Sequence, residues 1–168
     1  MHVVVTGPAA SGKSTLARAL ADTLGLPLLA KDTLKQGLLD VLGADDLEAS
    51  RRLGRAAVAA LLAVARANSA AVLDSVWVDR DRAVAELGGL GDVVEVFCRT
   101  DPATMRGRYR ARSSSKGPGH FDEQRPDEEL WPPYALEPLA GGWPVVQVDT
   151  TGPVDVDAVA RQVRSAWP

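Results

Sequence analysis

The segment Gly7–Thr15, which reads GPAASGKST, constrains the fold of this chain more than any other part of the sequence. It matches the pattern G-x-x-x-x-G-K-[ST]. Glycines let the backbone turn successive N–H groups inward, and the positive end of a following helix adds to the attraction for anions. His2–Thr6 (HVVVT) predicts a buried strand before the motif, and Lys13–Leu24 predicts a helix with one apolar face after it. We therefore interpret the segment as a phosphate-binding loop.

Position within the motif predicts a role for each residue. Lys13 is expected to reach the β- and γ-phosphates and to act in catalysis, and the Ser14 hydroxyl is expected to ligate Mg²⁺. ATP and Mg²⁺ are therefore the predicted cofactors, and GTP stays open because no base-reading Asn-Lys-x-Asp motif is present. The residues expected to bind the nucleotide here are Gly7, Pro8, Ala9, Ala10, Ser11, Gly12, Lys13, Ser14 and Thr15.

Short β-branched runs alternate with Ala-, Leu- and Arg-rich stretches along the chain. Besides the first strand, the predicted strands are Leu26–Ala30, Ala70–Ser75, Val93–Cys98 and Val145–Asp149. The further predicted helices are Thr33–Leu42, Leu47–Ala67, Arg80–Leu87, Pro102–Arg112 and Val156–Trp167. This alternation favours an α/β fold with a mainly parallel sheet that is covered by helices on both faces. Its 168 residues suit one domain spanning 1–168.

Two aspartates follow predicted strands, and the carboxyl ends of parallel strands form the usual ligand crevice. Asp32 is expected to face the γ-phosphate and to accept or orient the proton of an acceptor hydroxyl. The alternative for Asp32 is a helix N-cap for Thr33–Leu42. Asp74 ends the run AAVLD, where an acid would hold Mg²⁺ through water, and a turn-forming aspartate is its alternative.

Four arginines, Arg106, Arg108, Arg110 and Arg112, close a predicted helix before a Ser- and Gly-rich segment. Arg108 and Arg112 lie four residues apart and so share a helix face. We predict an arginine-bearing lid over about 113–133, which would neutralise charge on the phosphates and exclude water. The alternative is a solvated basic face.

The acceptor side is less well defined. Arg51 and Arg55 lie one turn apart and could meet an anionic substrate, although a solvated helix face explains them better. Trp77 could line the acceptor pocket or pack in the core, and Arg80 could pair with a substrate or stay solvated. His120 and Tyr134 are left without a role.

Composition excludes several functions. A net charge of −3 argues against broad non-specific binding to nucleic acid or to an anionic membrane. No apolar run approaches the roughly 20 residues that span a bilayer, so no membrane partner and a cytoplasmic location are expected. The single cysteine, Cys98, allows no internal disulfide. Oligomeric state is not fixed by the sequence.

Taken in order, the motifs resemble those of the small P-loop kinases, a family that includes kinases related to chloramphenicol phosphotransferase, polynucleotide 5′-hydroxyl kinases and gluconate and shikimate kinases. The segments that carry the resemblance are GPAASGKST, AKDTLKQGL, VLDSVWVDR, CRTDPATMRGRYRAR and VDTTGP. The resemblance implies a P-loop three-layer sandwich with a five-stranded parallel sheet in the order 2-3-1-4-5.

The resemblance also implies residue roles. Asp32 matches the aspartate that activates the acceptor, Arg108 the arginine that stacks on adenine, and Arg112 the lid arginine on the phosphates. The loop that borders the base matches Thr150, Thr151, Gly152 and Pro153. Where nucleoside monophosphate kinases show Asp-Gly-Phe-Pro-Arg, this chain has DSVWV at 74–78, so the resemblance leaves the acceptor open.

Three functions compete. The first is a kinase that transfers the γ-phosphoryl group of ATP to a hydroxyl of a small metabolite or antibiotic. A polynucleotide 5′-hydroxyl kinase would need a basic groove, and the acidic stretch Asp122–Glu129 counts against it. A non-catalytic nucleotide-binding module would leave Asp32, Asp74 and the arginines unexplained.

Overall fold

The computed structural model describes residues 1–77, 79–113 and 126–167, and its described strands form one parallel sheet. The spatial order is β2-β3-β1-β4-β5, which confirms the order that the family resemblance implied. The strands, in chain order, are β1 (His2–Thr6), β2 (Leu28–Ala30), β3 (Ala71–Asp74), β4 (Val93–Arg99) and β5 (Val145–Asp149). β2 begins two residues later than predicted, because Pro27 has no N–H to donate to a ladder.

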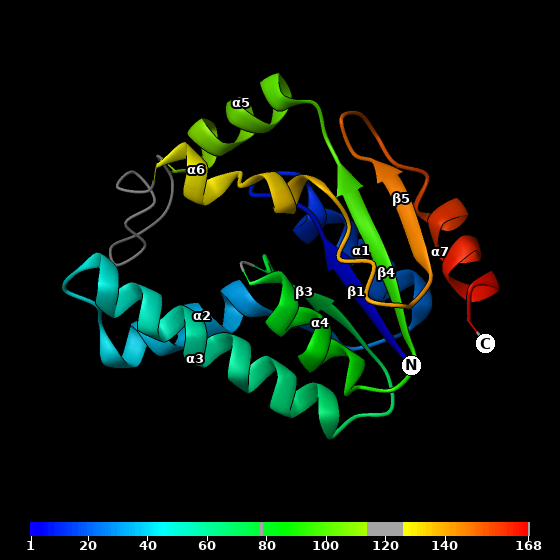
Figure 1. Ribbon diagram of the computed structural model, residues 1–168, viewed down its shortest axis with the longest axis horizontal. Coiled ribbons are helices and arrows are strands. Elements are labelled where there is room, and N and C mark those ends of the chain that lie inside the picture. The colour runs from blue at the N-terminus through cyan, green and yellow to red at the C-terminus, as the bar shows by residue number, and fades with distance from the viewer. Residues whose placement is uncertain (78, 114–125, 168) are drawn as a thin grey trace.

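Helices connect the strands and surround the sheet (Figure 1). Their bounds are α1 (Lys13–Leu24), α2 (Lys31–Leu42), α3 (Leu47–Arg66), α4 (Arg80–Gly88), α5 (Pro102–Ser113), α6 (Asp127–Leu130) and α7 (Val156–Ser165), with a 3₁₀ turn η2 (Pro133–Leu136). The prediction that the first residue of α2 is Thr33 was wrong. α2 begins at Lys31, directly after β2, with Ala30 in extended conformation as its N-cap.

Two apolar layers enclose the sheet, as expected for strands that are buried on both faces. Val3 and Val5 pack with α1 and α7 on one side. Val4 points to the other side and packs with α3 and α4. This alternation along β1 gives the three-layer α/β sandwich seen in Figure 1, in which α2 and α3 lie side by side on one flank.

A fully buried carboxylate joins the sheet to the loop that precedes β5. Glu95 on β4 is 0% exposed and accepts four hydrogen bonds at 2.6–3.1 Å. The donors are the Thr6 hydroxyl, the Leu139 and Ala140 backbone N–H groups and the Trp143 indole. Glu95 therefore ties β1, just before the phosphate-binding loop, to the segment 139–143, in which Ala140 lies 45 residues after Glu95 in sequence.

The predicted lid at 113–133 falls partly outside the described residues, since 114–125, which include His120, are not described. Its described end contains α6 and Trp131, which lie against α5. Among the described helices, none combines the length and the apolar character needed to cross a membrane.

Candidate nucleotide and phosphoryl-transfer site

The phosphate-binding loop connects β1 to α1, as the motif predicts. Gly7 has φ 136°, and a Cβ atom there would lie 2.7 Å from both the Cys98 carbonyl oxygen and the Ser11 Oγ. Gly12 has φ 87°, and Ala10 also adopts positive φ, at 61°. The loop therefore combines left-handed backbone with a close approach to β4, and at Gly7 only glycine meets both conditions.

Side chains hold the carbonyl groups of the loop. Lys13 Nζ donates to the Pro8 carbonyl oxygen at 3.2 Å. The hydroxyls of Thr100 and Thr150 lie 2.9 and 2.6 Å from the Ser11 carbonyl oxygen. Thr100 was not predicted as a site residue, because nothing in its local sequence places it beside the loop; β4 and β5 bring it there.

Lys13 and Asp74 face each other in a buried setting. Lys13 is 6% exposed and Asp74 is 5% exposed. Burial lowers the pKa of Lys13, while the negative charges of Asp74 and then Asp32 act to raise it. Burial raises the pKa of Asp74, opposed by the charge of Lys13 and by a hydrogen bond from the Ser14 side chain. Each group thus offsets part of the cost of burying the other.

The chemistry of Asp74 fits a metal ligand. Its Oδ1 is buried and has no hydrogen-bond partner among the described residues, while Ser14, the predicted second ligand, contacts the same carboxylate. A hard cation such as Mg²⁺ prefers carboxylate, hydroxyl and water oxygens. The predicted pair Ser14 and Asp74 is therefore brought together at the end of β3.

Asp32 lies in the first turn of α2, one strand away from Asp74. Parallel pairing places Ala30 opposite Asp74, so both aspartates leave the same edge of the sheet. The alternative that Asp32 is a helix N-cap was wrong, because Ala30 holds that position and no side chain caps the helix. The carboxylate is 56% exposed and lies 2.9 Å from Lys31 Nζ. Its charge acts on the pKa values of both Lys13 and Asp74, so it faces the same space.

A cavity of about 420 Å³ opens beside the loop. Its walls come from the loop and α1, from two arginines of α5 and from the segment after β5. The lining residues are Ala10, Gly12, Lys13, Ser14, Thr15, Leu16, Ala19, Arg108, Arg112, Thr150, Gly152, Pro153, Val154 and Val156. Predicted phosphate-binding and base-binding residues from three separate segments thus surround one space.

Arg108 and Arg112 both reach this cavity, as their shared helix face predicts. Arg108 donates to the carbonyl oxygens of Thr150 and Thr151 at 2.9 and 3.0 Å, which fixes the segment after β5 against α5. The positive charge of Arg112 acts to lower the pKa of Lys13, so the two cations lie near each other. Such a pair of cations attracts a polyphosphate.

The comparisons with known proteins agree with this arrangement. The protein family described as an AAA domain matches residues 3–130. The chain belongs to this family. A presumed kinase from Chloroflexus aurantiacus J-10-fl is 30% identical to this chain, and its structure superposes with a TM-score of 0.85 over 99% of this chain and 98% of that one. No curated protein matches the chain.

Solved structures of lower identity share the fold of this chain. A gluconokinase from Sinorhizobium meliloti 1021 is 20% identical, with a TM-score of 0.60 over 98% of this chain and 90% of that one. A shikimate kinase from Acinetobacter baumannii in complex with shikimate is 18% identical, with the same TM-score and coverage. The predicted resemblance to small P-loop kinases is thereby confirmed.

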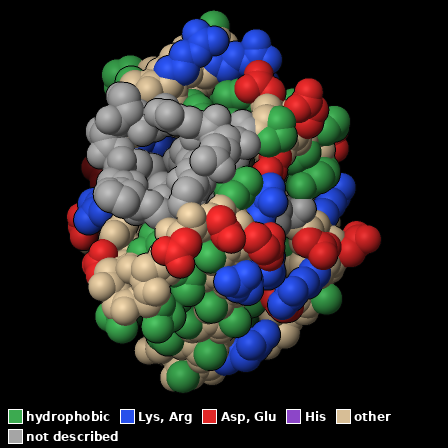
Figure 2. Space-filling view, turned by 90° about the vertical axis from the view of Figure 1, so that its left-hand side faces the viewer, with side chains coloured by type: hydrophobic (Ala, Val, Ile, Leu, Met, Phe, Trp, Pro, Cys, Tyr) green, Lys and Arg blue, Asp and Glu red, His purple; other side chains and the backbone are tan. Residues whose placement is uncertain are grey.

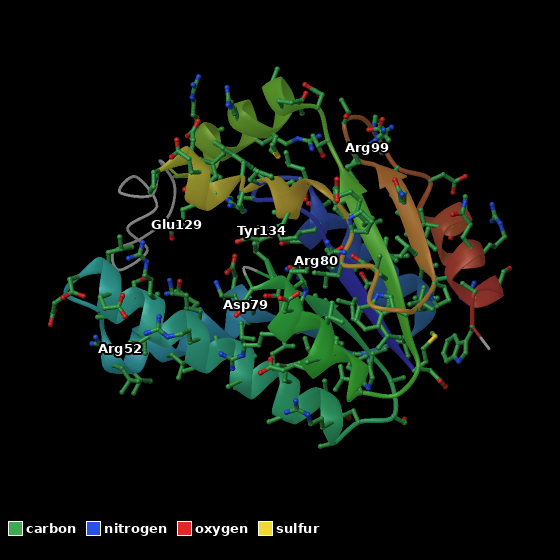
Figure 3. The ribbon with its side chains drawn as sticks, viewed as in Figure 1. Arg52, Asp79, Arg80, Arg99, Glu129 and Tyr134 are labelled. Atoms are coloured by element: carbon green, nitrogen blue, oxygen red, sulfur yellow. The ribbon has the colours of Figure 1, made fainter. Side chains whose placement is uncertain are left out.

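The remaining predicted substrate residues do not line the cavity. Arg51 pairs with Glu129 at 2.7 Å, and Arg55 pairs with Glu48 at 2.9 Å. Arg80 donates to the Leu139 carbonyl oxygen at 2.8 Å and lies at the start of α4, with Asp79 beside it (Figure 3).

Trp77 is buried in the core against α3 and α4, which is the core-packing alternative. Its indole Nε1 nonetheless has no hydrogen-bond partner among the described residues. Arg106 pairs with Asp127 at 3.7 Å, away from the cavity. The acceptor side therefore rests on Asp32 more than on the other candidates.

Proposed function

We propose that this protein is an ATP- and Mg²⁺-dependent kinase that transfers the γ-phosphoryl group to a hydroxyl of a small molecule. The observation that carries the proposal is the meeting of three charged groups at one edge of the sheet, where the buried Lys13 and Asp74 lie beside the strand pair that leads to Asp32. A nucleotide-binding module without catalysis has no use for a second carboxylate, Asp32, at this place.

The nucleotide side of the mechanism follows from the loop and the cavity. The inward N–H groups of the loop and the N-terminus of α1 would bind the α- and β-phosphates. Lys13 would neutralise charge on the β- and γ-phosphates, and Arg112 would add a second cation as charge develops during transfer. Arg108 and the segment Thr151–Pro153 would hold the base.

Ser14 and Asp74 would hold Mg²⁺, with Asp74 acting through water. When bound, the ion supplies neutralisation of phosphate charge and alignment of the transferred group. Asp74 has to be ionised for this role, and the facing charge of Lys13 favours that state against burial.

Asp32 would orient the acceptor hydroxyl and accept its proton at a carboxylate oxygen. The exposure of its side chain suits a group that a substrate must reach. Its position in the first turn of α2 also places the carboxylate at the positive end of the helix dipole. Lys31 Nζ lies 2.9 Å from the carboxylate and pairs with it.

The charge distribution favours a small acceptor over a polynucleotide. On the described part of the face in Figure 2, acidic and basic side chains are interspersed and form no continuous basic track. Arg51 and Arg55 are each paired with a glutamate of the same chain, which leaves less positive charge for a phosphate backbone.

The test is a screen of sugar-like metabolites, aminoglycosides and phenicols for acceptor-stimulated ATP consumption, run beside GTP and an oligonucleotide with a 5′-hydroxyl. With an acceptor in hand, Asp32→Asn should lower kcat by about 10²- to 10⁴-fold. Asp40→Asn, an exposed change on the same helix, is the matched control and should retain the wild-type rate. Lys13→Ala that binds and turns over ATP normally would refute the kinase proposal, whereas a normal Asp32→Asn would refute only the base.

A further inference from the structure

Trp131 follows α6 and contacts the phosphate-binding loop from outside the cavity. Its indole Nε1 donates to the Ala9 carbonyl oxygen at 3.0 Å, across 122 residues of sequence. Trp131 is not among the residues that line the cavity, so it does not occupy the space of the nucleotide. The contact therefore supports the loop on the side away from the cavity.

The peptide geometry gives this contact a consequence inside the loop. The Ala9 carbonyl and the Ala10 N–H belong to one planar trans peptide unit and point in opposite directions. A bond that holds the Ala9 oxygen on the outer side therefore holds the Ala10 N–H on the inner side, where Ala10 lines the cavity. Ala10 also has φ 61°, in the left-handed region that alanine adopts only at an energetic cost, and the contact with Trp131 helps to stabilise this conformation.

The indole of Trp131 is itself held in place. Its ring meets Tyr109 edge to face, with centroids 5.5 Å apart. Arg106 lies on α5, as Tyr109 does, and its guanidinium carbon is 5.7 Å from the centroid of the Trp131 ring. Ala9, Ala10, Met105, Tyr109 and Leu130 form a buried apolar cluster against which Trp131 packs.

The short helix α6, which precedes Trp131, is fixed from two sides. Asp127 pairs with Arg106 of α5 at 3.7 Å. Glu129 points from α6 toward α3 (Figure 3) and pairs with Arg51 at 2.7 Å. The half-buried pair Arg51–Glu129 thus connects α3 to α6, the helix directly before Trp131.

We infer that Trp131 is a positioning residue for the phosphate-binding loop, whose indole N–H holds the 9–10 peptide unit with the Ala10 N–H turned toward the nucleotide phosphates. The inference rests on the proposed nucleotide-binding function of that loop. On this inference Arg51, through its pair with Glu129, holds α6 in place and does not bind substrate.

The test compares Trp131→Phe, which keeps an aromatic ring but removes the donor, with Trp167→Phe, the same change at an exposed site on the C-terminal side of α7. Calorimetric titration with ADP should show about 3- to 10-fold weaker binding for Trp131→Phe, the loss of one hydrogen bond, and no change for Trp167→Phe. In the assay, KM for ATP should rise while KM for the acceptor stays the same.

Amide hydrogen exchange without nucleotide gives an independent measurement. Exchange at residues 7–12 should rise by about 3- to 10-fold in Trp131→Phe while the global urea midpoint is unchanged. Unchanged exchange, or a rise spread over the whole sheet, would overturn the inference. If the wild type binds no ADP, the proposed function fails, and the exchange result still decides whether Trp131 holds the loop.

A second pair of variants covers the case in which Trp131→Phe does not fold. Arg51→Gln removes the ion pair between α3 and α6 without changing the indole, and Arg55→Gln breaks a pair that lies within α3. Faster exchange at residues 7–12 in Arg51→Gln alone supports the inference. Equal exchange at residues 7–12 in the two variants contradicts it.

Discussion

Glu95→Gln is the substitution whose effect on stability can be worked out most directly from the structure. The side chain keeps its volume and its place on β4, but one carboxylate oxygen becomes an NH₂ group. Thr6 and the Leu139 N–H donate to Oε1 at 2.6 and 2.8 Å, and the Ala140 N–H and the Trp143 indole donate to Oε2 at 2.9 and 3.1 Å. In either orientation of the glutamine amide, its NH₂ group faces two groups that are themselves hydrogen-bond donors.

The favourable orientation places the NH₂ group on the side of Thr6, whose hydroxyl can turn round and accept. The Leu139 N–H is then left buried without an acceptor, which costs about 1–3 kcal/mol. The other bonds lose their charge-assisted strength, although removing a buried charge offsets part of that loss. The expected net destabilisation is about 2–4 kcal/mol, a large share of the roughly 5–15 kcal/mol that stabilises a typical domain.

Urea unfolding followed by tryptophan fluorescence measures this change. With an m value of about 2 kcal/mol per molar, the midpoint of Glu95→Gln should fall by about 1–2 M at unchanged m. Glu128→Gln on the exposed face of α6 is the control and should shift the free energy of unfolding by less than about 0.5 kcal/mol. If the two variants unfold at the same midpoint, the account of Glu95 as the anchor of the 139–143 loop is wrong.

Three further predictions concern the loop, the arginine and pH. Gly7→Ala should abolish measurable ADP binding in calorimetry, because its Cβ would meet the Cys98 carbonyl oxygen, whereas Gly37→Ala in the exposed interior of α2 should raise the free energy of unfolding by about 0.5–1 kcal/mol. Arg108→Lys loses the two-carbonyl contact and should weaken ATP binding by about 3- to 10-fold; unchanged binding would show that the segment after β5 needs no such anchor. Burial and the nearby N-terminus lower the pKa of His2 below its ordinary 6.5. As pH drops below about 6.5 the unfolded chain therefore binds a proton that the folded chain does not, and the free energy of unfolding should fall. His2→Phe should remove this part of the pH dependence of urea unfolding, and an unaltered dependence would contradict the argument.

Local patterns predicted the secondary structure well where backbone chemistry is decisive. The strand His2–Thr6 and the helix Lys13–Leu24 have the predicted bounds, since an apolar β-branched run and an amphipathic run flank a glycine-framed loop. Val145–Asp149 was also predicted with its observed bounds. The start of α2 was missed because β2 passes directly into the helix without a separate capping residue.

The candidate site was predictable to the extent that its residues carry a contiguous motif or end a strand. Asp32 and Asp74 could be placed near Lys13 because parallel strands end at a common edge. Arg51 and Trp77 could not be resolved from the sequence, because pairing with Glu129 and packing against α3 both depend on segments far away in the chain.

The sequence by itself determined the phosphate-binding loop, because the glycines, Lys13 and Ser14 act through the conformation of adjacent backbone. Only the tertiary structure decided what surrounds that loop. Glu95 lies in an apolar run that shows no sign of four donors, and Trp131 reaches Ala9 only because α5 and α6 fold back over the loop. These contacts depend on the order of the strands and on the crossing connections, which no local pattern encodes.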